Sequence, residues 1–272
     1  MSVIIAVSFS LRRDPYEVTE ISSQITIAVV CFSKLRLPQA KEFCALHELP
    51  LLKEKDNKYD LQLLFHDDLI ALFDSELNTS ISIDFTKGAL AHRQQFGGGR
   101  GQAIAKAIGL KSGITPTVLD TTAGLAGDAF VLATLGCPIT MVERSPVLFR
   151  LIEDAINRAE LSESFQHIMR QGFHIINADA NHFIAEQMQN DDTRPDVIYI
   201  DPMYPERKKS ALVKKDMQIL QKLHGEADNT AELLENALRY ARKRVVVKRP
   251  SHAETLSERT PNTSIKSKKT RY

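Results

Sequence analysis

The sequence has no hydrophobic run long enough to cross a membrane and no recognisable export signal. No apolar stretch approaches the roughly 20 residues that a bilayer-spanning helix needs. The N-terminal stretch MSVIIAVSFS has no basic residue before it and is followed by LRRDP, so it is a poor signal peptide. We therefore expect a cytoplasmic protein.

Cysteines are few and far apart. Cys31, Cys44 and Cys137 form no CxxC pair, and the eight histidines do not fall at ligand spacing near them. We expect three reduced, mostly buried thiols, no disulfide framework and no metal site.

The net charge is only +1, but the charged residues are unevenly distributed. Residues 41–84 contain ten acids against four lysines, whereas residues 87–111 contain five basic residues and no acid. Two further basic clusters are ERKKSALVKK (206–215) and RKRVVVKR (242–249). Phosphates respond to local rather than total charge, so three such clusters favour a nucleic-acid-binding face over solvated helix surfaces.

The chain is expected to fold as two units, residues 1–85 and residues 86–272. Its 43% hydrophobic and 25% charged residues are typical of a globular protein and exclude disorder over the whole chain. The first unit is predicted to be a small α/β fold. It has a buried strand at 25–33, a helix at 38–49, short strands around turns up to residue 74, and an alternating strand at 81–85.

The second unit begins with a glycine-rich junction at 88–113, whose helix Gly109 is predicted to close. Apolar strands then alternate with helices. The predicted strands are 117–120, 138–143, 173–177, 196–201 and 244–249; the predicted helices are 128–136, 145–159, 180–189, 211–223 and 230–241. This pattern predicts an α/β fold with a Rossmann-like parallel sheet covered by helices on both faces.

Ligands of such sheets bind at the carboxyl ends of the strands, and chemically informative residues follow the first strand directly. Asp120 ends that strand and leads into the turn A-G-L-A-G-D, which contains Gly124, Gly127 and Asp128. The glycines allow close backbone approach, and the next helix offers free N–H groups. The turn lacks G-x-G-x-x-G, and its acids would repel a pyrophosphate but tolerate a sulfonium cation.

Acids also follow the second and third strands. Glu143 lies twenty-three residues after Asp120, where a carboxylate typically accepts both ribose hydroxyls of an adenosine. Asp179 is placed to accept from an adenine amino group. Together with the glycine turn, these acids favour S-adenosylmethionine over NAD as the cofactor.

The fourth strand runs into YIDPMYP (199–205), which places Asp201, Pro202 and Tyr204 beyond the sheet edge. This segment is similar to the [DNS]-P-P-[YFW] motif of enzymes that methylate exocyclic amino groups of planar nitrogen heterocycles, with Met203 replacing the second proline. The lone pair of such an amino group is delocalised into the ring. The Asp201 carboxylate and the Pro202 carbonyl would hold its N–H bonds as charge develops, and Tyr204 would stack on the base.

Basic residues near these motifs are candidates for RNA phosphate contacts. FGGGRG (96–101) could form a backbone N–H nest, but it lacks G-K-[ST] and is not a P-loop. The candidate RNA-binding residues are Arg93, Arg100, Lys208, Lys209, Lys214, Lys215, Lys248 and Arg249.

Several blocks, in this order and spacing, closely resemble the ribosomal RNA small subunit methyltransferase J family. They are DFTKGALAHRQQFGGGRGQAIAKAIG, LDTTAGLAGDAF, VERSP, YIDPMYPERKKSALVKK and KRVVVKRP, within about residues 84–250. The resemblance implies a class I methyltransferase that uses S-adenosylmethionine to methylate N2 of one guanosine in small-subunit (16S) rRNA, free or in an assembling subunit. The cofactor contacts that it implies are Gly127, Asp128, Glu143, Arg144, Asp179, Ala180 and Asp201.

The chain departs from the family pattern at three places. Ala126-Gly127-Asp128 stands where the family commonly has G-R-D, and Asp179-Ala180 replaces a pair that is often Ser-Ser. The family usually continues a little beyond SIKSKKTRY, so we expect the last edge hairpin of a seven-stranded sheet to be short or incomplete. The first 25 or so residues are expected to be an extension without a counterpart.

Other functions fit parts of this pattern. D-P-x-Y does not choose the base, so an adenine-N6 or cytosine-N4 methyltransferase acting on another nucleic acid remains open. A nucleotide-binding oxidoreductase is disfavoured by the missing G-x-G-x-x-G. A non-catalytic RNA-binding ribosome-assembly protein is disfavoured because Asp201, Pro202 and Tyr204 are all present.

Overall fold

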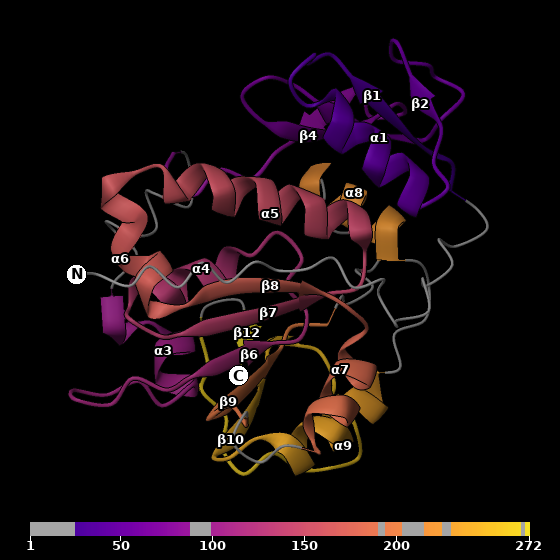
Figure 1. Cartoon of the computed structure of the whole chain (residues 1–272). Coiled ribbons are helices and arrows are strands. Elements are labelled where there is room, and N and C mark those ends of the chain that lie inside the picture. The colour runs from indigo at the N-terminus through magenta and orange to yellow at the C-terminus, as the bar shows by residue number, and fades with distance from the viewer. Residues whose placement is uncertain (1–24, 88–98, 190–193, 203–214, 225–229, 268–269) are drawn as a thin grey trace.

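The computed structural model describes residues 25–87, 99–189, 194–202, 215–224, 230–267 and 270–272. Two five-stranded β-sheets organise these residues, one on each side of a long helix (Figure 1). The expected N-terminal extension lies outside the described residues. Among the described helices, none combines the length and apolarity that crossing a bilayer requires.

The first sheet has the order β2-β1-β3-β4-β5. Its strands are β1 (Ile27–Cys31), β2 (Leu51–Leu52), β3 (Leu61–Phe65), β4 (Ile70–Asp74) and β5 (Thr79–Ile81), and helix α1 (Leu37–Leu46) packs on β1. β1 is parallel to both neighbours, whereas β3, β4 and β5 form an antiparallel meander. The predicted strand at 25–33 and helix at 38–49 correspond to β1 and α1.

The predicted strand at 81–85 is wrong, because β5 ends at Ile81. Ile83 and Phe85 are nevertheless buried, and the Phe85 ring stacks on Phe130 with centroids 4.7 Å apart. The apolar alternation therefore marks a segment that crosses from the first sheet to the core of the second. It does not mark a further strand.

The second sheet is entirely parallel, with the order β10-β9-β6-β7-β8. Its strands are β6 (Val118–Asp120), β7 (Ile139–Glu143), β8 (Phe173–Asn177), β9 (Val197–Ile200) and β10 (Arg244–Val247). β6 lies between β7 and β9, so the strand order reverses beside it, which is where ligands bind in such sheets. The predicted Rossmann-like α/β fold is confirmed.

Helices cover both faces of this sheet (Figure 1). The helices that follow its strands are α4 (Gly127–Thr134), α5 (Pro146–Glu160), α6 (Glu163–Gln171), α7 (Ala180–Gln187), α8 (Lys215–His224) and α9 (Thr230–Tyr240), and η1 (Gly99–Gly101) and α3 (Ala103–Ala107) precede it. Leu119 and Ile198 pack with α7 and α9, whereas Val118 and Tyr199 belong to the core on the α4–α5 side. Successive residues of each strand thus enter opposite cores.

Helix α6 was not predicted, since the pattern left residues 160–172 unassigned. This helix is mostly polar, and it buries Phe165 and Ile168 against the rest of the core. Phe165, Ile168 and Met169 fall at i, i+3 and i+4, the spacing of an amphipathic helix, so the sequence held a usable signal that the prediction missed. The predicted start of α5 is confirmed, because the Ser145 hydroxyl accepts a hydrogen bond from the Leu148 N–H at 3.4 Å.

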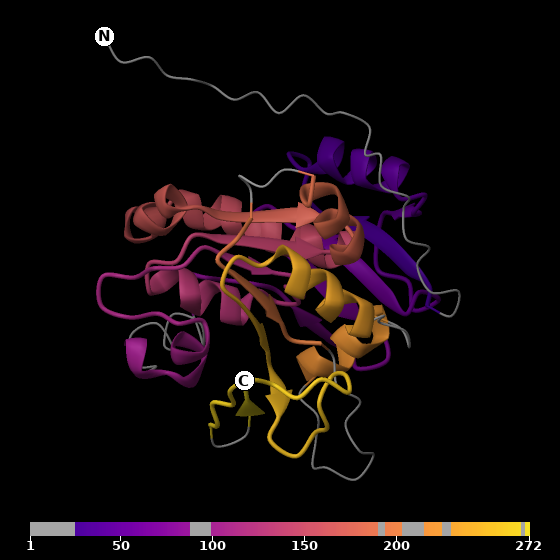
Figure 2. The same ribbon diagram turned by 90° about the horizontal axis from the view of Figure 1, so that it is seen from below.

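The final hairpin is short, as expected, but the expected seven-stranded sheet is not seen among the described residues, where the parallel sheet has five strands. Strands β11 (Arg249–Pro250) and β12 (Thr270–Arg271) pair with each other over two residues each, apart from the five-stranded sheet. The view from below shows the C-terminal segment, in yellow, on the same side of the molecule as α9 (Figure 2).

Asp154 on α5 joins the two sheets. Its Oδ1 accepts a hydrogen bond from Arg36 Nη1 at 2.5 Å. Its Oδ2 accepts from the Ile70 N–H at 3.0 Å and from Arg158 Nε at 2.9 Å. Because Asp154 is buried, these bonds fasten α5 to β4 and to the start of α1.

Candidate active site

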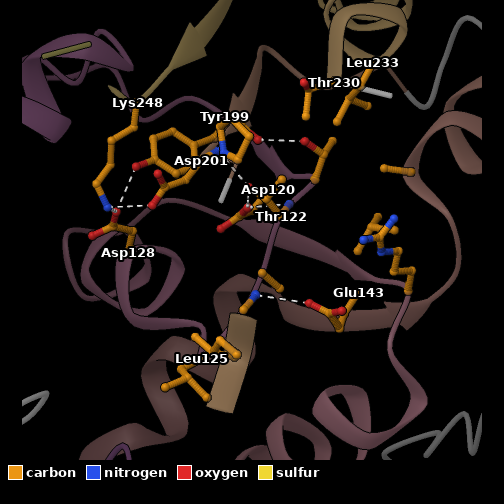
Figure 3. A pocket seen from close by; sticks show the side chains of 18 of the residues that line it. Asp120, Thr122, Leu125, Asp128, Glu143, Tyr199, Asp201, Thr230, Leu233 and Lys248 are labelled. Carbon is orange, nitrogen blue, oxygen red and sulfur yellow. Dashed lines mark hydrogen bonds and ion pairs between the residues drawn. The ribbon is translucent and has the colours of Figure 1, made fainter. Parts of the chain in front are cut away.

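A cavity of about 530 Å³ lies at the carboxyl ends of β6, β7 and β9, beside the reversal of strand order (Figure 3). Most of the residues predicted from the sequence line it. Those predicted for the cofactor are Asp120, Gly124, Gly127, Asp128, Glu143, Arg144, Asp179, Ala180 and Asp201, and Pro202, Lys248 and Arg249 lie in the same wall. Parallel strands bring these positions together because their carboxyl ends share one edge of the sheet.

Glu143 ties the glycine turn to the next helix. Its Oε2 accepts the Gly124 N–H at 3.1 Å, and its Oε1 accepts the Ser145 N–H at 2.9 Å. The side chain is buried. Gly124 has φ +55°, a backbone conformation that glycine adopts without steric cost. The carboxylate is therefore fixed in orientation at the cavity wall.

Ala126 departs from the residue type expected in such a turn. It is a buried alanine with φ +57°, and it precedes the first residue of α4. A left-handed conformation is costly for a residue with a Cβ. The turn thus has a fixed geometry even though only two of its residues are glycine.

Asp179 caps helix α7. Its Oδ1 accepts the N–H groups of Asn181 and His182 at 2.9 and 3.1 Å. Asn181 in turn accepts a hydrogen bond from Asn236 of α9 at 2.9 Å. Asp179, the predicted adenine contact, therefore also has a structural role, because as the N-cap it holds the N-terminus of α7 at the cavity.

Asp201 is held at the end of β9 by both its backbone and its side chain. Its N–H donates to Thr122 Oγ1 at 2.7 Å, and its Oδ2 accepts from Lys248 Nζ at 2.6 Å. Lys248 also donates to Asp128 Oδ2 at 2.7 Å, and the Tyr199 hydroxyl donates to the same oxygen at 2.8 Å. Figure 3 shows the ammonium group between the two carboxylates.

Burial and crowding of like charge shift the titration of these groups. Burial, together with the nearby Asp128 and Asp201, raises the pKa of Asp120 to about 7. Burial also raises the pKa of Asp201, although Lys248 opposes this shift. Burial alone would lower the pKa of Lys248, but Asp201 and Asp128 outweigh it and raise that pKa. The site is rich in negative charge and suits a cationic ligand.

Several lining residues were not identified from the sequence. Thr122 and Tyr199 orient Asp201 and Asp128, and Met217, Leu220 and Leu233 supply apolar wall from α8 and α9. The two threonines after Asp120 were a usable signal, since they directly follow a strand of the predicted sheet. The apolar residues of α8 and α9 carried no signal, because any core helix has similar ones.

Fewer of the predicted RNA-binding residues than of the predicted cofactor-binding residues lie at the cavity. Arg249 lines the cavity, and its Nε donates to the Glu254 carbonyl at 3.3 Å. Arg100 donates to the Lys111 carbonyl at 2.8 Å, and Lys215 donates to the Leu77 carbonyl at 3.4 Å; neither lines the cavity. The predicted residues that lie outside the described part of the chain are Arg93, Tyr204, Lys208, Lys209 and Lys214.

Comparison with known proteins gives a consistent result. Residues 44–272 match a protein family described as "Putative SAM-dependent methyltransferase". Ribosomal RNA small subunit methyltransferase J of Shewanella amazonensis is 47% identical over 237 residues, which cover 86% of this chain and 92% of that protein. The protein of the same name from Haemophilus influenzae is 43% identical over 253 residues, which cover 92% of this chain and 95% of that protein.

A solved structure has the same fold. The crystal structure of a SAM-dependent methyltransferase from Neisseria gonorrhoeae superposes with a TM-score of 0.70 at 30% sequence identity. The match covers 90% of this chain and 93% of that one, so it includes both sheets.

Proposed function

The chain belongs to the ribosomal RNA small subunit methyltransferase J family of SAM-dependent methyltransferases, and on that premise we propose that it methylates N2 of one guanosine in small-subunit (16S) rRNA. One observation carries the proposal. The carboxylate of Asp201 and the adjoining Pro202 border the same cavity as the acids after β6 and β7. An acceptor for an amino group and a site for a cationic nucleoside cofactor are thus contiguous.

The cavity fits S-adenosylmethionine in size and chemistry. A volume of about 530 Å³ lies within the range of small-molecule sites, about 300–1,000 Å³. Glu143 lines the cavity, and a carboxylate oxygen can accept more than one hydrogen bond, so this side chain is proposed to hold the ribose hydroxyls beside the Gly124 and Ser145 N–H groups that it already accepts. Asp179, Ala180 and Leu233 would surround the adenine. Asp120 and Asp128 would lie toward the positively charged methionine end.

The bound cofactor supplies a methyl group on a sulfonium centre, and the residues of this chain prepare the acceptor nitrogen. Asp201 would accept one N–H of the guanine amino group, and the Pro202 carbonyl would accept the other. As the nitrogen gains the methyl group it must lose a proton, and the Asp201 carboxylate is the group placed to take it. Burial raises the pKa of Asp201, which favours that transfer. Tyr204 is proposed to stack on the base.

The RNA would approach from the mouth of the cavity. Arg249 lies in its wall and would contact a phosphate there. Lys208, Lys209, Lys214 and Arg93 are proposed to extend this basic surface, together with Arg100 and Lys215 at its periphery. The partner would be small-subunit rRNA or an assembling small subunit, which implies a cytoplasmic location.

The test is single-turnover methylation of small-subunit rRNA by the purified protein, followed by mass mapping of the modified nucleosides. We expect N2-methylguanosine at one position. Asp201→Ala should lower the rate about 10²–10³-fold, because one preorganised electrostatic partner of the transition state is lost. Asp201→Asn should lower it less, since it keeps one acceptor. RNA affinity should change far less.

Two results would contradict the proposal. Methyladenosine or N4-methylcytidine as the product would keep the chemistry and change the substrate. A rate within threefold of the parent in Asp201→Ala would mean that D-P-M-Y-P is only a turn at the end of a strand.

A further inference from the structure

Lys248 lines the cavity and forms ion pairs with two of its carboxylates. Its ammonium lies 2.6 Å from Asp201 Oδ2 and 2.7 Å from Asp128 Oδ2, and only 23% of its side chain is exposed. The sequence had suggested an RNA contact for this lysine. Within the described part of the chain, Asp201 Oδ1 accepts no hydrogen bond, so that oxygen is left for a ligand (Figure 3).

We propose that Lys248 is a positioning residue for Asp201, which engages one carboxylate oxygen and thereby presents the other, ionised, to the amino group of the substrate. The proposal rests on the function proposed above and deepens it. The ammonium is anchored from β10, the neighbour of β9, so the pairing of these two strands sets where the acceptor oxygen points.

The surroundings of Asp201 explain why a cation is needed there. Asp128 and Asp120 are the acids that face it, Tyr199 donates to Asp128, and Arg249 is the other cation that acts on it. Like charges so close share a proton unless a cation separates them. A protonated carboxyl gains an O–H donor and loses acceptor capacity, which defeats the role proposed for Asp201. Lys248 is the main group that lowers the pKa of Asp201 against the effect of burial, and Arg249 adds a smaller effect.

A lysine in this place could also serve only to fasten strands together. The chain contains a matched pair for comparison, since Lys243 Nζ lies 3.0 Å from Asp196 Oδ1. Asp196 precedes β9 and Lys243 precedes β10, each five residues before its counterpart in the cavity. The Asp196–Lys243 pair joins the same two strands at their amino ends. Lys243→Met is therefore the control for Lys248→Met.

The activity test measures single-turnover methylation of small-subunit rRNA against pH, at saturating RNA and cofactor. Lys248→Met should be slower by about tenfold or more at neutral pH and should recover toward the parent rate as the pH rises and the carboxylate ionises. Lys248→Arg keeps the charge and should keep the profile of the parent protein. Lys243→Met should match the parent at every pH.

A second readout does not depend on catalysis. Carbon-13 NMR of the aspartate carboxyl groups in cofactor-free protein should show a higher pKa for Asp201 in Lys248→Met than in the parent. If Lys248→Met does not fold, the double variant Asp128→Asn/Lys248→Met, which removes one charge of each sign, takes its place. In that case the expected result is a rate that stays below the parent, with the pH profile of the parent largely restored.

The outcomes separate the two proposals. A Lys248→Met profile parallel to that of the parent, or an Asp201 titration that does not move, overturns the role of Lys248. A parent protein that does not methylate guanine N2 overturns the proposed function, while the NMR titration still tests the coupling between Lys248 and Asp201.

Discussion

Asp120 shows how a single residue can serve a binding site at a cost to stability. It is a buried carboxyl at the end of β6, and its Oδ1 accepts the Thr122 N–H at 3.0 Å. Burial and two neighbouring carboxylates favour its protonated form. Such conflicts are expected where a group is retained for its ligand rather than for the fold.

The pH dependence of stability should reveal this conflict. The pKa of Asp120 rises from 3.8 to about 7 on folding, so between these values the folded state binds more protons than the unfolded state. Stability contributed by this group therefore falls as pH rises from about 4 to 7 and stays low above that. Asp120→Asn, which keeps the acceptor, should raise the free energy of unfolding at pH 8 by up to about 4 kcal/mol.

Denaturant unfolding at about pH 5 and 8 makes the comparison. At pH 5 the folded carboxyl is protonated while the unfolded one is mostly ionised, so the variant should be more stable than the parent by only about 1.5 kcal/mol there, against the larger gain at pH 8. An equal effect of Asp120→Asn at both pH values would mean that the charge of Asp120 does not destabilise the folded state.

At the scale of elements, helix α8 connects the first sheet to the cavity. Its Met217 and Leu220 line the cavity, while Lys222 reaches the first sheet. Lys222 Nζ lies 2.8 Å from Asp74 Oδ2, at the end of β4, and 2.7 Å from Glu76 Oε2. The first sheet thus supports one wall of the site without contributing a lining residue from its strands.

Lys222→Met should therefore affect both stability and cofactor binding. Asp74 is fully buried, and loss of its cation leaves its charge uncompensated. Because Lys222 is 26% exposed, we expect a loss of about 1–3 kcal/mol rather than the larger cost of a fully buried pair. Cofactor affinity, measured by calorimetry, should fall several-fold as α8 shifts.

The more exposed Asp196–Lys243 pair is again the control. Lys243→Met should leave both quantities close to those of the parent. A Lys222→Met protein with reduced stability but unchanged cofactor affinity would show that α8 holds its place without this anchor.

At the scale of the whole molecule, the two sheets share one hydrophobic core. Buried residues of the first sheet, such as Val29 and Leu63, belong to the same cluster as Phe130 and Leu151 of the second unit. We propose residues 1–85 and 86–272 as two units by topology, joined at the segment around Phe85. Because their cores are continuous, they should unfold together.

Asp154→Ala tests how firmly the units are joined. The change leaves the Ile70 N–H and the Arg36 and Arg158 guanidinium groups without their shared acceptor. We expect a loss of about 2–4 kcal/mol in the free energy of unfolding, by denaturant titration. Glu153→Ala, one residue away on α5, removes only an i,i+3 pair with Arg150 and should cost about 0.5 kcal/mol or less. Equal losses in the free energy of unfolding for the two variants would show that Asp154 does not join the two units.

The order of elements and most of the cavity wall could be predicted from the sequence. Apolar strands that alternate with helices specify a parallel sheet, and parallel strands collect the residues at their carboxyl ends along one edge. Asp120, Glu143, Asp179 and Asp201 were predictable for this reason, since each follows or ends a strand. Local signals also located the start of α5 at Ser145.

Other features depend on contacts between distant segments. The alternation at 81–85 predicted a strand, but whether Ile83 and Phe85 enter a sheet or a neighbouring core depends on what lies beside them. Lys248 resembles any other member of a basic cluster, and its charge becomes part of the cavity only because β10 pairs with β9. In the low dielectric of that position, an ammonium must lie against carboxylates, and the pairing of the strands determines which ones.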